Sequence, residues 1–320
     1  MAEAIETVAM GADTTVGRRK RPTHIVVFLA PALVVYTMFS VYPLLDTIWL
    51  SLYATDDTGQ AHFVGFGNFI TLLADPVWSA PFWNAFRNNL VFFAIHITVQ
   101  TSIGLALASL LSLPNLKGAS VYRTLLFMPT MLSVVIIGFI WQLILSPLWG
   151  IARNFLATFG LASLFHPWLG QESTALITVS LISVWQFVGI PMILIYAALI
   201  NIPDDLIDAA TVDGAPAFHI FWRIRLPLIY PTLGVVSILT FVGNFNAFDL
   251  IYAMKGAQAG PNYHTDILGT FFYRTFFGYQ LQTGNPTMGA AVATMMLLII
   301  LVGVLIYLFG VQRRLQHHLA

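Results

Sequence analysis

The sequence predicts an all-α, polytopic membrane protein with six transmembrane helices. The 320 residues are 58% hydrophobic, and their mean hydropathy is +0.80. Only 9% are charged, whereas a soluble domain carries about 25%. The apolar residues are also gathered into six long stretches. A chain of this composition has lipid as part of its solvent.

Several classes of protein are disfavoured by what the sequence lacks. The formal net charge is zero, with 14 basic and 14 acidic residues, so nothing indicates nucleic-acid binding. The absence of Cys excludes disulfides, thiolate zinc sites and thiol catalysis, and we expect no metal site and no cofactor in the chain. We find no His-Glu-x-x-His or Gly-x-Ser-x-Gly motif and no pair of intramembrane acids. A multi-pass membrane enzyme is therefore a lesser alternative.

A spanning helix needs about 20 mostly apolar residues, because each residue rises 1.5 Å across a core about 30 Å thick. Six stretches meet this length. They are Ile25–Leu45, Asn89–Leu113, Leu125–Leu145, Thr174–Leu199, Leu228–Met254 and Thr287–Val311.

The distribution of cations predicts the orientation of these spans. With the N-terminus inside, ten of the 14 Lys and Arg residues fall in cytoplasmic segments, among them Arg18–Arg21, Lys117 and Arg223. Short basic loops stay on the cytoplasmic side, so both termini are predicted to be cytoplasmic. Residues 1–23 then form a mobile basic tail, and residues 24–320 form the transmembrane domain.

The loop between the fourth and fifth spans predicts a helix-turn-helix at about residues 203–225. Pro203 suits the first turn of a helix, Asn201 is a candidate cap, and Asp204 and Asp205 favour its positive end. Gly214 is a natural stop. A second short helix follows and is expected to end before Pro227. A motif that combines apolar and acidic positions is suited to docking into another protein. The alternative is a helix on the lipid surface, which is disfavoured because anionic lipids repel acidic residues.

This loop carries the residues that resemble a known family. The run from Asp208 to Ala215, followed by Leu226 and Pro227, is similar to the EAA motif of ABC importer permeases, and specifically of the carbohydrate-uptake group. Segments from Phe63 to Phe69, from Val121 to Arg123 and from Asn244 to Tyr252 resemble the same group. The resemblance covers almost everything after residue 24.

The resemblance implies a type I ABC importer permease in a bacterial or archaeal cell membrane. Its partners would be a second homologous permease, two ATPase subunits that bind ATP and Mg, and an extracytoplasmic solute-binding protein. The coupling residues would be Asp208, Ala209, Ala210, Asp213, Gly214, Leu226 and Pro227. The family usually has Glu where this chain has Asp208. No P-loop is possible here, because none of the three Lys residues is followed by Ser or Thr.

Polar residues inside the spans are the candidates for the solute path, because burying them in lipid is costly. One face of the predicted fifth span carries Thr240, Asn244 and Phe248, and another carries Asn246 and Asp249. In the predicted fourth span, Ser183 and Gln186 align on one face, beside Trp185. The resemblance places Ser183, Gln186, Thr240 and Asn244 at the sugar site of maltose-type members. The alternative is that these groups only hydrogen-bond between helices. For Asn244 and Gln186 both interpretations stay open, and for Asn246, Asp249 and His96 the structural one is favoured.

The charges within the spans favour a neutral sugar or oligosaccharide as the solute. No Lys or Arg lies inside a predicted span, so an anion has no obvious partner, and Asp249 alone gives little support for a polyamine. Glycerol phosphate, a polyol or a polyamine remains the alternative cargo for an ABC permease. An ion-driven carrier is a third possibility, but it leaves the acidic helix-turn-helix unexplained.

Overall fold

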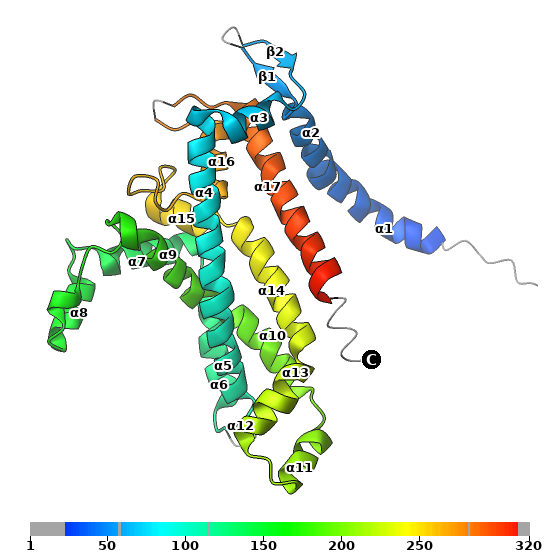
Figure 1. Cartoon of the computed structure of the whole chain (residues 1–320), viewed down its shortest axis with the longest axis vertical. Helices are drawn as coiled ribbons and strands as arrows, with labels where there is room; N and C mark the ends of the chain where they lie inside the picture. The colour runs from blue at the N-terminus through cyan, green and yellow to red at the C-terminus, as the bar shows by residue number, and fades with distance from the viewer. Residues whose placement is uncertain (1–22, 57–58, 114–115, 281, 313–320) are drawn as a thin grey trace, which may run out of the picture. The chain divides into compact units, whose positions relative to one another are not determined.

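The computed structural model describes residues 23–56, 59–113, 116–280 and 282–312 (Figure 1). The predicted tail, residues 1–23, lies outside this part of the chain except for Thr23. Contacts divide the chain into two compact units, Met1–Asp46 and Thr47–Ala320.

From Thr23 onward, where the structure describes it, the first unit is one continuous apolar helix. It consists of α1 (Thr23–Tyr36), a π-helical turn η1 (Thr37–Val41) and the beginning of α2 (Tyr42–Leu50). The helical stretch Val27–Leu50 is long and apolar enough to cross a membrane, and none of its most apolar window is buried. A helix that is apolar on all sides must be covered by lipid or protein, which agrees with the first predicted span.

The second span starts well before its predicted beginning at Asn89. It is continuous from Pro76 to Leu111 and comprises α4 (Pro76–Ile95), η2 (His96–Gln100) and α5 (Thr101–Leu111). The Asp75 side chain caps it by accepting a hydrogen bond from the Val77 N–H at 2.9 Å. Proline at the first helical position has no N–H to leave unpaired, so the helix begins at Pro76.

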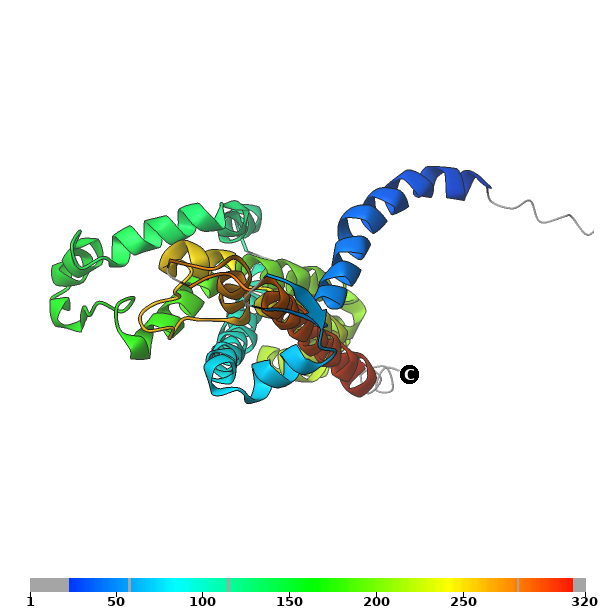
Figure 2. The same cartoon turned by 90° about the horizontal axis from the view of Figure 1, so that it is seen from above.

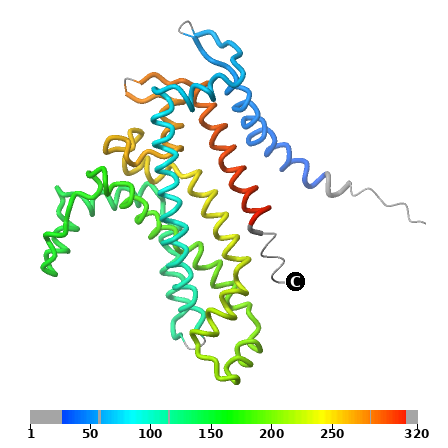
Figure 3. Tube along the Cα trace, viewed as in Figure 1, coloured from blue at the N-terminus to red at the C-terminus, as the bar shows by residue number. Residues whose placement is uncertain are grey.

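The third span is not the continuous helix predicted over Leu125–Leu145. It consists of α6 (Ala119–Phe127) with the 3₁₀ turn η3 (Met128–Met131), and then α7 (Val134–Leu145), which is bent from them by 95°. Figure 3 traces this turn, and in the view from above α7 runs sideways (Figure 2). Pro129 lies in η3, where its missing N–H prevents a regular helical bond.

The fourth and fifth spans are also bent or interrupted. The fourth consists of α9 (Glu172–Phe187) and α10 (Gly189–Ile200), at 44° to each other. The fifth, predicted as Leu228–Met254, consists of α14 (Tyr230–Phe245), which is bent by 64° from the helical stretch Ala217–Leu228 before it. After α14 the predicted span breaks at residues 246–248, and α15 (Asp249–Lys255) follows. The sixth is α17 (Pro286–Ile306), extended by η6 (Tyr307–Gln312).

In the described residues, three helices are by themselves long and apolar enough to cross a membrane. Three further pairs of bent helices meet the same criteria, so the number of spans reaches six only if each bent pair counts as one span. The remaining elements are β1 (Tyr53–Thr55), β2 (Ala61–Phe63), α3 (Gly67–Ala74), α8 (Ile151–Thr158), η4 (Ala162–Leu164), α11 (Asp204–Val212), α12 (Ala217–Ile220), η5 (Phe221–Arg225), α13 (Leu226–Leu228) and α16 (Leu268–Phe277).

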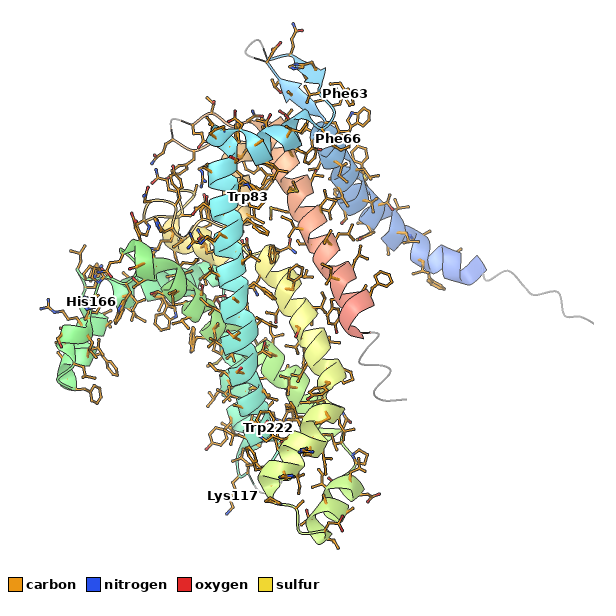
Figure 4. The ribbon with its side chains drawn as sticks, in the orientation of Figure 1. Phe63, Phe66, Trp83, Lys117, His166 and Trp222 are labelled. Atoms are coloured by element: carbon orange, nitrogen blue, oxygen red, sulfur yellow. The ribbon has the colours of Figure 1, made fainter. Side chains whose placement is uncertain are left out.

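The second unit is held together by three apolar clusters. One, around Phe82, Phe245 and Phe271, joins α4, α14, α16 and α17. Another, around Met192, Ile195 and Ile229, joins α5, α10 and α14. Lys117 and Trp222 lie at the same end of this unit, with α11 and α12, and Trp83 lies toward the other end (Figure 4). This arrangement agrees with placing the loop around Lys117 and the helix-turn-helix on one side of the membrane.

Candidate solute cavity and coupling surface

The largest concentration of predicted solute-path residues is in a cavity of about 440 Å³, which we call the amide cavity. It lies between the second, fourth and fifth spans. Its polar lining residues are His96, Gln100, Ser183, Thr240, Asn244, Asn246 and Asp249. Aromatic and aliphatic side chains, including Phe92, Phe187 and Phe248, form the rest. A cavity of this size with a few polar groups on an apolar wall is typical of small-molecule sites.

The break in the fifth span contributes Asn246, Ala247 and Phe248 to the lining of this cavity. Asn244 and Phe245 end α14, and Asp249 begins α15. Gly269 of α16 packs against the break, where an added Cβ would lie 3.2 Å from the Cβ of Phe248. Asn246 and Asp249 are exposed here. Six of the eight predicted path residues thus line one cavity, namely Ser183, Thr240, Asn244, Asn246, Phe248 and Asp249.

Gln186 lies outside the amide cavity, although its spacing places it on a helical face with Ser183. It is fully buried, and its Nε2 donates to the carbonyl oxygen of Leu132 at 3.3 Å. Leu132 follows the 3₁₀ turn of the third span, where the regular helix stops. The bend in the third span, which the sequence analysis did not predict, therefore leaves the Leu132 carbonyl beside Gln186. The hydrogen bond from Gln186 stabilises that bend.

Trp185 also lies away from the amide cavity. Its ring meets the ring of Trp141 edge to face at 5.6 Å. Both line a separate cleft with Trp168. Trp185 therefore does not cover the face of a solute bound in the amide cavity.

Gln100 is a lining residue that the sequence analysis missed. It is nearly fully buried, and its Nε2 donates to the carbonyl oxygen of Phe187 at 3.1 Å. Phe92, His96 and Gln100 follow one another at intervals of four residues, so the spacing rule used for the fifth span would have found it.

Two amide oxygens of the cavity residues lack a hydrogen-bond partner among the described residues. They are Oε1 of Gln100 and Oδ1 of Asn244; Oε1 of Gln186, outside the cavity, is a further one. A buried acceptor without a donor costs about 1–3 kcal/mol. A ligand hydroxyl beside Gln100 or Asn244 would remove that cost.

His96 is held by contacts on both ring nitrogens. Nδ1 lies 2.8 Å from the carbonyl oxygen of Phe92, and Nε2 lies 3.0 Å from Oγ of Ser183. The contact with Ser183 joins the second span to the fourth, and both contacts fit the structural interpretation of His96. Within the described residues no group of three or more His, Asp or Glu could hold a metal ion.

The helix-turn-helix takes the predicted form, with two local differences. Gly214 ends α11 with φ of 78°, and the Gly214 and Ala215 N–H groups donate to the carbonyls of Thr211 and Ala210 at 3.0 Å, which is the Schellman pattern. Asn201 does not cap α11; its Nδ2 donates to the carbonyl of Ala197, because the side chain completes the end of α10 instead. The second helix also includes Pro227 and breaks at Ile229.

The predicted coupling residues are divided between the surface and the bundle. Asp208, Ala209, Asp213 and Gly214 are exposed, Ala210 and Pro227 are half-buried, and Leu226 is buried. Ile207 packs with the cluster that contains Leu226 and so attaches α11 to the bundle. Val212 is 87% exposed and Phe218 73% exposed. Both apolar side chains are therefore left uncovered at this surface.

Comparison with known proteins identifies relatives along most of the chain. The family model for the binding-protein-dependent transport system inner membrane component matches residues 100–316. The probable ABC transporter permease protein YurN of Bacillus subtilis is 32% identical over 276 residues, covering 86% of this chain and 91% of that protein. The lactose transport system permease protein LacF of Rhizobium radiobacter is 29% identical over 281 residues, covering 88% and 91%.

A solved structure has a similar fold. It is the crystal structure of a bacterial ABC transporter involved in the import of the acidic polysaccharide alginate, with a TM-score of 0.78. The sequences are 23% identical, and the match covers 92% of this chain and 96% of that one.

Proposed function

Because the chain belongs to the family of binding-protein-dependent transport system inner membrane components, we propose that it translocates a neutral sugar or oligosaccharide through the amide cavity. The predicted family and the predicted all-α importer permease fold are confirmed. The chain is a membrane subunit of a transport system.

The side chains that line the amide cavity favour a neutral sugar as the solute. Sugar hydroxyls both donate and accept, and the lining offers amides, hydroxyls and the aromatic faces of Phe92 and Phe248. Within the described lining the only charged residue is Asp249, which would repel glycerol phosphate or another anion. The relative named for lactose transport supports the same class of solute.

Energy for transport is supplied, in this proposal, by two separate ATPase subunits that bind ATP and Mg and dock on α11. Asp208 and Asp213 are exposed beside Val212 and Phe218, so the surface combines charge with uncovered apolar area. Closure of the ATPases would favour either the inward-facing or the outward-facing state of the permease. Coupling is then the difference between the affinities of the ATPases for these two states.

The remaining partners follow from the same assignment. A second homologous permease would complete the membrane pore, and an extracytoplasmic solute-binding protein would deliver the sugar to the end opposite α11. Both termini would be cytoplasmic, in accord with the excess of cations predicted for the inner segments.

Reconstitution tests this function directly. The permease pair, the ATPases and the binding protein are placed in proteoliposomes, and uptake of lactose, maltose and glycerol phosphate is measured with ATP. We expect uptake of at least one sugar and none when the ATPases are omitted. Uptake of glycerol phosphate alone, or uphill transport by this chain without ATPases, would overturn the proposal.

A further inference from the structure

A second cavity, of about 400 Å³, is lined by the beginning of α4, the loop that precedes α16, α16 itself and Gln282 of the loop after it. The beginning of α4 and α16 lie at the end of the second unit opposite α11 and α12 (Figure 1). We call this second cavity the arginine cavity. Its lining includes Trp78, Asn84, Tyr263, Asp266, Arg274 and Gln282. In the predicted orientation it is at the outer face of the membrane.

The wall of the arginine cavity is fixed by a buried ion pair. Nη2 of Arg274 lies 2.7 Å from Oδ2 of Asp266, and both side chains are buried. The same guanidinium donates to the carbonyl oxygen of Ala257 at 2.8 Å, and the Thr270 hydroxyl donates to Asp266 Oδ1 at 2.7 Å. Burial raises the pKa of Asp266, and Arg274 with Thr270 offsets part of the rise.

The loop that contributes Tyr263 is also tied to α4. Nδ2 of Asn84 donates to the carbonyl oxygen of Tyr263 at 2.9 Å, and Nδ2 of Asn88 donates to that of Asp266 at 2.9 Å. The guanidinium carbon of Arg274 lies 4.7 Å from the centre of the Tyr263 ring. Both sides of the cavity are therefore positioned before any ligand arrives, which lowers the entropic cost of binding.

The lining matches the chemistry of a neutral saccharide. Its two charges neutralise each other, so a charged ligand meets no uncompensated partner among the described lining residues. Trp78 and Tyr263 supply aromatic rings that suit the apolar face of a sugar, and Asn262 and Gln282 supply exposed amides that suit its hydroxyls. A purely apolar ligand would leave those amides without partners.

The second span connects the arginine cavity to the amide cavity. Val77, Pro81 and Asn84 line the first cavity, and Phe92, His96 and Gln100 line the second. Together with Asn88 they recur every three or four residues, so each side chain lies next to the following one along the helix. Asn84 and Phe92 are separated by a rise of about 12 Å along the helix. A solute that moves inward along this row of side chains meets the arginine cavity first.

We propose that the arginine cavity is an outer saccharide subsite that holds a sugar unit before it reaches the amide cavity. The inference rests on the proposed function, because it requires a neutral sugar as the solute. It differs from docking of the binding protein, which would need only surface contact at this end.

Saturation-transfer NMR tests the subsite on the assembled complex of permeases and ATPases in nanodiscs, without binding protein. Lactose and maltose are the probes, and Asn244→Ala is present throughout to weaken binding in the amide cavity. We expect Trp78→Ala and Gln282→Ala each to raise the Kd of the transported sugar about tenfold, as the loss of one well-placed contact does. Trp83→Ala is the control, because Trp83 is on the same helix but does not line the cavity.

The outcomes separate this inference from the proposed function. If the wild-type complex transports a sugar but both variants bind it like the control, the subsite does not exist, while the transport function stands. If the variants leave the Kd for sugar unchanged and weaken only the binding of the sugar-free binding protein to the complex, the cavity is a protein-docking site and the inference is wrong. If no sugar is transported or bound at all, both fail. Gln282 is exposed, so its variant tests the subsite even if Trp78→Ala does not fold.

Discussion

The side chain of Asn89 in the second span donates from Nδ2 to the backbone carbonyl of Asn244 in the fifth, at 2.9 Å. Its Oδ1 accepts from the Leu268 N–H at the start of α16, at 3.1 Å. Asn89 is fully buried. One amide thus bonds to two backbone groups and joins the second span to the end of α14 and to the start of α16.

Asn89→Ala is expected to destabilise the second unit, because it leaves the buried Leu268 N–H without its acceptor. The Asn244 carbonyl loses one donor but still accepts from the Ala247 N–H at 3.2 Å. A buried donor without a partner costs about 1–3 kcal/mol. Thermal unfolding of the solubilised permease measures the effect. Asn246→Ala is the matched control, since its side chain is exposed and, among the described residues, donates only to the Val242 carbonyl of the adjoining α14. Equal melting temperatures for the two variants would contradict this role of Asn89.

Gly269→Ala is expected to displace the break in the fifth span. An added Cβ would run into the Ala247 carbonyl and lie 3.2 Å from the Cβ of Phe248. Overpacking of this kind costs about 1–3 kcal/mol. In Gly243→Ala the new methyl meets nothing within 4 Å, and we expect a gain of about 0.5–1 kcal/mol from the helix preference of Ala. Unfolding free energies test the pair, and a neutral Gly269→Ala would argue against the close approach.

Asn244→Ala is expected to raise the KM for sugar uptake about tenfold while the complex still assembles, because one hydrogen bond to the solute is lost. Gln186→Ala is the comparison: its side chain bonds to the Leu132 carbonyl, so it is expected to lower stability without changing KM. Uptake kinetics in proteoliposomes separate the two effects. If Asn244→Ala instead prevents assembly, its role is structural.

Asp208→Lys is expected to abolish recovery of the ATPases with the permease and to leave the bundle folded, because Asp208 is exposed on α11. Reversing the charge replaces attraction by repulsion at the proposed contact. Asp208→Glu keeps the charge and is the control, with recovery retained. Co-purification is the measurement. Normal recovery and uptake with Lys at this position would exclude a docking role for Asp208.

Lys255 is expected to react with amine reagents at lower pH than an ordinary lysine. It follows the predicted fifth span, and burial lowers its pKa to about 8, since burial disfavours the charged ammonium. An ordinary lysine has a pKa of about 10.4. Competitive acetylation followed by mass spectrometry measures its midpoint, which we expect near pH 8. A midpoint above pH 10 would show that the ammonium is well solvated.

Patterns within single segments predicted much of the site as well as the fold. Thr240 and Asn244 line one cavity because four-residue spacing within a continuous helix such as α14 sets which side chains share a face. Phe248 lines the same cavity although the helix ends before it, so its position depends on the break and not on the spacing. Gln186 shows the limit of this rule. Its partner, the Leu132 carbonyl, is freed by a bend in another span, and no periodicity within the fourth span contains that information.

The sequence by itself determined the membrane class, the approximate spans and the helix-turn-helix, because apolar length, charge placement and the Gly214 stop are local properties. Only the tertiary structure decided where the third and fifth spans break, which polar groups meet across helices, and that Asp266 and Arg274 form the wall of an outer cavity. The physical reason is that a freed carbonyl or a buried charge is stabilised by whichever partner lies nearest in space, and in this chain that partner often comes from a different helix.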